Sequence, residues 1–144
     1  MRLWHKSLIA YLPDMQLKGQ WRECCLIATQ IKENGTPNHL LVNKITEYHA
    51  DHFYSYCVGV WSEMDKRGFK MSTKSCWKIA KVDGGIIATS KMFNGWHNKE
   101  YLRVCMANLY EKYKFGRGKS RITENEWQRL FDGYKQITSE EYHI

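Results

Sequence analysis

Apolar positions recur at steps of three and four residues over much of the chain, which is the pattern of amphipathic helices. The first such stripe follows Pro13 and Asp14, two residues that suit a first helical turn. Gly35 suits the end of that helix. The stripe consists of Leu17, Trp21, Cys24, Ala28 and Ile31. We therefore predict a helix from about Pro13 to just before Gly35, with Arg22 and Glu23 outside its apolar stripe.

A second helix is predicted from about Ala50 to Arg67, where apolar residues again fall on one face. That face consists of Phe53, Cys57, Val60, Trp61 and Met64. Lys66 and Arg67 suit the negative end of the helix dipole, and Gly68 suits the position after the last turn.

Two more helices are predicted in the last third of the chain. Asn98 can cap a helix that ends near Gly116, and its apolar stripe consists of Leu102, Cys105, Leu109 and Tyr113. Thr123 and Glu126 have the spacing of a capping box. The helix that they begin has an apolar face of Trp127, Leu130, Phe131 and Tyr134.

The remaining segments carry weaker patterns. Residues 1–12 fit an extended segment or a short helical turn, and residues 35–47 fit a loop followed by a short apolar run. Residues 69–96 combine helical and strand character around a turn at Asp83-Gly84-Gly85. We predict one compact, mostly α domain over residues 1–144. It has three to four main helices, an amino-terminal segment packed against them, and a helical extension over residues 119–144.

Charge narrows the class of partner. The chain has 22 Lys and Arg against 15 Asp and Glu, a net charge of +7 and a calculated pI near 9.2. This excess suits an anionic partner, with nucleic acid before a membrane surface, although a basic protein without such a partner is an equal alternative on charge alone. No apolar run is long enough to cross a bilayer and no signal peptide is visible, so a cytoplasmic monomer is expected.

Cysteine and histidine give no metal signal. The five cysteines are odd in number and lack paired zinc spacing, which favours free thiols in a reducing compartment. His49 and His52 could share a helix face near Cys57, but no fourth ligand stands at a standard spacing. We expect neither a metal nor another cofactor.

The start of the chain offers a nucleophile. Met1 begins the sequence, and an α-amine has a pKa of about 7.7–8.0, against about 10.4 for a lysine side chain. The amine is therefore far more often unprotonated near neutral pH. If Glu23 faces it, the pair could form an imine with a sugar. In the simpler alternative, Arg22 and Glu23 are solvated charges on the helix surface that contribute under about 1 kcal/mol to stability.

The most basic stretch is KYKFGRGKSR at residues 112–121. Its charged residues are Lys112, Lys114, Arg117, Lys119 and Arg121, and the aromatic residues Tyr110, Tyr113 and Phe115 lie among or beside them. Such a mixture can bind phosphates and stack on bases, while a solvated basic loop is the alternative. Trp21 and Trp127 are expected in the core.

Three segments in order resemble the phage-type pyrimidine-dimer DNA glycosylases. They are LKGQWRECCLIA at residues 17–28, KRGF at 66–69 and YEKYKFGRG at 110–118. The strongest part is the aromatic-Arg-Glu triplet at residues 21–23, and the resemblance spans roughly residues 1–118. It implies a small all-α enzyme that removes a damaged base from double-stranded DNA and cuts the abasic strand without a metal.

The resemblance also implies residue roles. The α-amine of the first residue would attack the sugar, Glu23 would be the catalytic carboxylate, and Arg22 would hold a phosphate near the reaction. His39 corresponds to a histidine in the second loop of the family. The DNA-binding residues expected in total are Arg2, His39, Lys66, Arg67, Lys112, Tyr113, Lys114, Phe115, Arg117, Lys119 and Arg121.

One position departs from the family pattern. Family members lose the initiator Met from a small second residue, whereas residue 2 is Arg here. Met1 is then expected to stay and to carry the amine, one residue or about 3.5 Å farther from Glu23. Arg2 could contact DNA, and the substrate could be another damaged or modified base. The alternatives are a non-catalytic nucleic-acid-binding domain and a basic cytosolic protein that binds an acidic partner.

Overall fold

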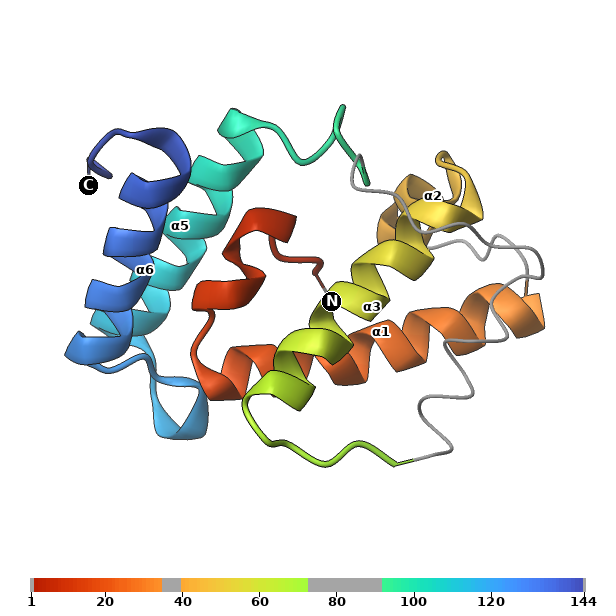
Figure 1. Ribbon diagram of the computed structural model, residues 1–144, viewed down its shortest axis with the longest axis horizontal. Helices are drawn as coiled ribbons and strands as arrows, with labels where there is room; N and C mark the ends of the chain where they lie inside the picture. The colour runs from red at the N-terminus through yellow and green to blue at the C-terminus, as the bar shows by residue number, and fades with distance from the viewer. Residues whose placement is uncertain (1, 35–39, 73–91, 144) are drawn as a thin grey trace.

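The computed structural model describes residues 2–34, 40–72 and 92–143, which fold almost entirely into helices (Figure 1). The 3-10 helix η1 (Lys6–Tyr11) is followed by α1 (Asp14–Asn34), α2 (Leu40–Thr46), α3 (Ala50–Lys66), α5 (Lys99–Phe115), the 3-10 turn η2 (Gly118–Ser120) and α6 (Glu124–Thr138). The described ranges contain no strand. The predicted mostly α class is confirmed.

Capping residues set the helix starts as the sequence predicted. Asn98 accepts a hydrogen bond from the backbone N–H of Tyr101 at 2.9 Å and so begins α5. Thr123 and Glu126 form the full capping box at the start of α6, with bonds of 2.9 and 3.3 Å. These bonds satisfy backbone donors that lack a partner within the first helical turn.

Two features differ from the expectation. Leu40–Thr46 is a short helix, where only an apolar run was expected. Trp61 is 37% exposed, although the rest of its predicted face is buried. The end of α5 at Phe115 agrees with the predicted end near Gly116, so the first four residues of the basic stretch 112–121 are helical. Much of the mixed region, including Asp83-Gly84-Gly85, lies outside the described residues.

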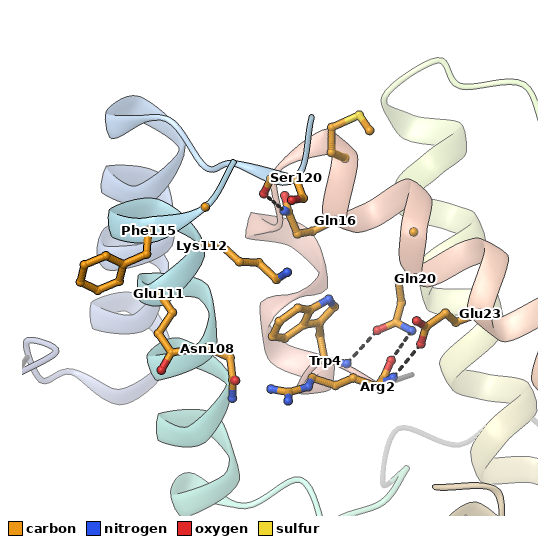
Figure 2. A pocket seen from close by; sticks show the side chains of 13 residues that line it. Arg2, Trp4, Gln16, Gln20, Glu23, Asn108, Glu111, Lys112, Phe115 and Ser120 are labelled. Carbon is orange, nitrogen blue, oxygen red and sulfur yellow. Dashed lines mark hydrogen bonds between the residues drawn. The ribbon is translucent and has the colours of Figure 1, made fainter. Parts of the chain in front are cut away.

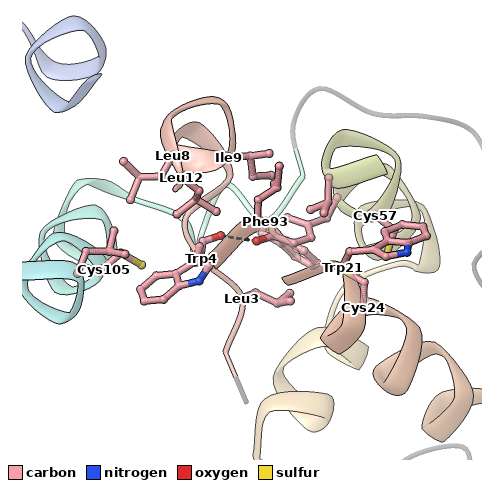
Figure 3. Packing of buried hydrophobic residues seen from close by; sticks show 14 of the residues in the cluster. Leu3, Trp4, Leu8, Ile9, Leu12, Trp21, Cys24, Cys57, Phe93 and Cys105 are labelled. Carbon is pink, nitrogen blue, oxygen red and sulfur yellow. Dashed lines mark hydrogen bonds between the residues drawn. The ribbon is translucent and has the colours of Figure 1, made fainter. Parts of the chain in front are cut away.

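The amino-terminal segment lies at the centre of the fold. In Figure 1 it runs between the pair α5 and α6 on one side and the pair α1 and α3 on the other, and η1 packs against both α3 and α6. Its apolar side chains Leu3, Trp4, Leu8, Ile9 and Leu12 are all buried. Figure 3 shows them between Cys105 of α5 and the side chains of α1 and α3. The expected packing of this segment against the helices is confirmed.

Two arginines hold the end of η1. Arg67 donates to the carbonyl oxygen of Leu12 at 2.7 Å and to that of Ala10 at 3.2 Å. Arg129 of α6 donates to the same Ala10 oxygen at 2.8 Å. These bonds satisfy carbonyl groups that η1 itself leaves without a helical partner, and they tie the segment to both flanking helix pairs.

The described part of the chain has no helix long and apolar enough to span a bilayer.

Cys24, Cys57 and Cys105 are buried thiols outside any disulfide, as expected.

Gly133 lets α6 pack directly on the ring of Tyr11. A Cβ at residue 133 would lie 2.5 Å from Tyr11 Cγ and 2.7 Å from Cδ1, well inside van der Waals contact. We predict that Gly133→Ala lowers the free energy of unfolding by about 1–3 kcal/mol, because the ring must move out of a packed interface. Urea denaturation measures this change.

Gly59 of α3 is the matched control. A Cβ there would lie 3.9 Å from Ile9 Cδ1, an ordinary contact. Gly59→Ala should therefore leave stability unchanged or raise it by up to about 1 kcal/mol through helix propensity. Equal effects of the two substitutions would contradict the close packing of Gly133 on Tyr11.

Candidate active site

Gln20 of α1 fixes the backbone of the amino-terminal segment. Its side chain is 2% exposed. The amide oxygen accepts from the N–H of Trp4 at 2.7 Å, and the amide nitrogen donates to the carbonyl oxygen of Arg2 at 2.9 Å. Tyr56 of α3 donates to the carbonyl oxygen of Trp4 at 2.6 Å. These contacts set the position of residues 2–4 relative to α1.

Glu23 lies one helical turn after Gln20, on the same side of α1. Its Oε2 atom accepts from the backbone nitrogen of Arg2 at 2.7 Å. Figure 2 shows Gln20 and Glu23 side by side, with the three hydrogen bonds that connect them to Arg2 and Trp4. A half-buried carboxylate is thus held at the nitrogen of residue 2.

A cleft of about 610 Å³ opens beside this pair. One wall comes from the amino-terminal segment and α1, with Arg2, Gln20 and Glu23. The other wall comes from α5 and the residues after it, with Asn108, Glu111, Lys112, Phe115 and Ser120. Figure 2 shows the Lys112 side chain directed between the walls. The volume suits a nucleobase or a sugar-phosphate unit.

Two contacts shape the walls. Gln16 of α1 donates to the carbonyl oxygen of Ser120 at 2.9 Å and so connects the walls at one end. The guanidinium carbon of Arg2 lies 5.3 Å above the Trp4 ring, which is within cation–π range. Arg2 therefore brings a positive charge into the cleft, over the Trp4 ring.

Comparison with known proteins gives a family. The profile of a family described as pyrimidine dimer DNA glycosylase matches residues 1–76, which is more than half of the chain. The chain belongs to this family. No curated protein and no solved structure matches it. The matched range contains η1, α1, α2 and α3, and with them Gln20, Glu23 and the first wall of the cleft.

Some of the residues predicted for a glycosylase site meet at the cleft. Arg2, Glu23, Lys112 and Phe115 line it. Arg22 is exposed and reaches its edge, because a Cβ on the lining residue Gly19 would lie 3.7 Å from Arg22 Nη2. Met1 and His39 lie outside the described residues.

The other basic residues divide into two groups. Lys114, Arg117, Lys119 and Arg121 are exposed at the end of α5 and on the residues after it, the stretch of chain that supplies the second wall of the cleft. Lys66 is exposed at the end of α3 and is not among the residues that line the cleft.

Two of the residues predicted to bind DNA make contacts within the fold. Arg67 is only 11% exposed in its side chain and pairs with Glu63 at 3.0 Å and Asp14 at 2.9 Å, in addition to its bonds to the end of η1. Tyr113 stacks on Trp127, with ring centroids 5.7 Å apart and planes 5° apart. Both side chains are used within the fold.

Sequence reasoning missed Gln20, although a signal was present. Gln20 falls three residues after Leu17 and four before Cys24, which places it on the buried stripe of α1. A polar residue on such a stripe needs hydrogen-bond partners inside the protein. Here the partners are the backbone groups of residues 2–4. Asn108 and Glu111 carried no comparable signal, because their positions in the cleft depend on how α5 packs.

The histidines that the structure describes do not gather into a metal site. His49 caps α3 through its Nδ1 atom, and Nδ1 of His52 accepts from the N–H of Phe93 at 2.8 Å. Within the described ranges, no group of three or more His, Cys, Asp or Glu side chains could hold a metal ion.

His97 anchors the amino-terminal segment to the start of α5. It is 4% exposed, and its Nδ1 atom accepts from the N–H of Lys6 at 2.9 Å. His5 in turn contacts the carbonyl oxygen of His97 through Nε2 at 2.9 Å. Burial, with the nearby charges of His5 and Lys6, lowers the pKa of His97 to about 3. The ring is neutral at neutral pH, so Nδ1 is free to accept.

This anchor predicts acid sensitivity. Because the pKa of His97 is lower in the folded than in the unfolded protein, its contribution to stability is present above pH 6.5 and is lost as the pH falls. We expect a loss of about 2 kcal/mol between pH 7 and pH 5 from this group, measured by urea denaturation at both values. His5, whose pKa burial also lowers, adds to the loss. His97→Gln should flatten the pH dependence, and an unaltered slope in this variant would contradict the assignment.

Proposed function

We propose that this protein is a DNA glycosylase with abasic-site lyase activity on damaged or modified double-stranded DNA. The observation that carries the proposal is the 2.7 Å contact between Glu23 Oε2 and the backbone nitrogen of residue 2. A chain that begins at Arg2 would have its α-amine at this position. Family membership supports the glycosylase step.

This geometry favours the α-amine of Arg2 as the nucleophile. That choice departs from the expectation that Met1 stays and carries the amine, and it requires that Met1 be removed. A chain that keeps Met1 has a peptide nitrogen at residue 2, which is not nucleophilic, and its amine stands up to about 3.5 Å farther along the backbone. The bonds from Gln20 to Arg2 and Trp4 oppose a shift of register that would bring Met1 to the same place.

The reaction uses this amine and one carboxylate. The amine nitrogen bonds to the sugar carbon C1′, and the base leaves with the electron pair of its bond to that carbon. Loss of a proton from nitrogen and opening of the sugar give an imine, which acidifies the proton on the adjacent carbon. Removal of that proton breaks the C3′–O bond. Glu23 is placed to stabilise the positive charge on nitrogen and to transfer protons.

The cleft and its basic surroundings suit a DNA strand. Arg2 and Lys112 lie inside it, and Arg22 stands at its edge. The exposed residues Lys114, Arg117, Lys119 and Arg121 extend the positive surface beyond the second wall. Contacts of these groups with phosphates release counterions, so affinity falls steeply with salt. Removing a base from a duplex also requires that the base leave the stack.

Borohydride trapping tests the nucleophile. We expect protein that begins at Arg2 to form a covalent complex with abasic-site DNA, and protein that keeps Met1 to form it at least about tenfold more slowly. Intact-mass measurement of the amino terminus defines each sample, and peptide mapping locates the adduct. Acetylation of the α-amine is the control and should abolish trapping. An adduct on a lysine side chain would contradict the α-amine assignment.

Glu23→Gln tests the carboxylate. The amide keeps the shape of the side chain and can still accept from residue 2, but it cannot take up a proton. We expect strand cleavage to fall about 10²- to 10⁴-fold, while duplex binding stays near that of the wild type. Gel assays of a 5′-labelled abasic strand measure cleavage.

Glu33→Gln, an exposed position on the same helix, is the matched control and should cleave normally. Full cleavage by Glu23→Gln would remove Glu23 from the mechanism. DNA binding without trapping or cleavage by the wild type would leave a non-catalytic DNA-binding domain, and absence of salt-sensitive binding would favour an acidic protein partner.

A further inference from the structure

Phe115 is the one aromatic side chain of the basic stretch 112–121 that the fold leaves uncovered. It is 79% exposed, whereas Tyr113 stacks on Trp127. Phe115 also lines the cleft. Figure 2 shows it on α5, the wall opposite Glu23, with its ring directed outward, away from the Lys112 side chain and the space between the walls. A single exposed apolar side chain is common on protein surfaces, so it is the position of this ring and its surroundings that indicate a ligand.

The backbone around Phe115 is fixed, so its exposure is not the result of a loose helix end. Phe115 is the last residue of α5, and the N–H of Gly116 donates to the carbonyl oxygen of Lys112 at 3.1 Å. The N–H of Ile122, which is fully buried, donates to the same oxygen at 3.3 Å. A Cβ on Gly116 would lie 2.2 Å from that oxygen. The tight turn therefore requires glycine and fixes the backbone at Phe115, from which the exposed ring projects.

The surroundings of the ring identify its ligand class. Lys112, Lys114 and Arg117 flank it in sequence, and Lys119 and Arg121 follow on the same exposed segment. An apolar protein partner would have to cover this charge, which is costly. Nucleic acid offers both an anionic backbone and flat apolar bases within a few ångströms, and aromatic rings among basic residues are a common platform for unstacked bases.

We propose that Phe115 stacks on a base of the duplex that has been opened at the damaged site. The proposal rests on the proposed function and adds a residue that discriminates opened from intact DNA. In an intact duplex every base is already stacked on its neighbours and offers no face to the ring. Next to a missing or displaced base one face becomes free, and the ring can cover it.

Paired binding measurements test this role. Wild type, Phe115→Ala and Phe115→Trp are titrated at one salt concentration with two duplexes of the same sequence, one intact and one with a reduced abasic site. We expect Phe115→Ala to bind the abasic duplex about 5- to 150-fold more weakly and the intact duplex as the wild type does. Phe115→Trp should restore the preference.

A fluorescent base gives a second readout. With 2-aminopurine next to the abasic site, wild-type protein should quench its emission, and Phe115→Ala should not. Val104→Ala is the matched control, because Val104 is also an exposed apolar residue of α5, 51% exposed, but does not line the cleft. This variant should behave as the wild type in both assays.

The outcomes separate the two proposals. If the wild type neither binds nor is trapped by abasic DNA, the proposed function fails and the role of Phe115 fails with it. If the wild type binds and is trapped but Phe115→Ala keeps its full preference and quenching, the stacking role is wrong and the proposed function stands. Equal weakening on both duplexes would also overturn the role, since it would indicate a general surface contact.

Discussion

The structure depends on one constraint, namely that the backbone of residues 2–4 must satisfy its hydrogen bonds while running through the interior. An extended segment cannot bond to itself, so the partners come from α1. Gln20 bonds to both Arg2 and Trp4, and Glu23 bonds to the nitrogen of Arg2. Gln20 and Glu23 are three residues apart and therefore lie on the same face of α1. Their hydrogen bonds fix the position of residues 2–4 relative to this helix. The candidate chemistry follows from that position.

The rest of the fold supports this placement from the other sides. Arg67 and Arg129 hold the far end of η1 from α3 and α6, and His97 bonds to Lys6 from the start of α5. Residues from three distant parts of the chain therefore bond to the same short amino-terminal segment. A loss of packing between α6 and η1 would therefore change the position of residue 2, although no residue of α6 lines the cleft.

Local features of the fold could be predicted, and long-range ones could not. The capping residues Asn98 and Thr123 marked helix starts correctly, because a cap acts within one turn. The contacts of Arg67 with η1 and of Tyr113 with α6 could not be predicted, since these partners are known only once the helices are packed. In the site itself, Glu23 was identified as a candidate catalytic residue from the resemblance to the family. Its contact with the nitrogen of residue 2 could be seen only in the structure. Gln20 could have been found from its place on the buried stripe.

The cleft is assembled from two parts of the chain that lie far apart in the sequence. Its first wall lies within the range that matches the family, residues 1–76, while Asn108, Lys112 and Phe115 of the second wall lie beyond it. In the proposed reaction, the reacting groups Arg2 and Glu23 and the proposed base-stacking residue Phe115 thus come from separate halves of the polypeptide. Substitutions confined to the second wall would then alter which lesion is accepted without changing the reacting groups.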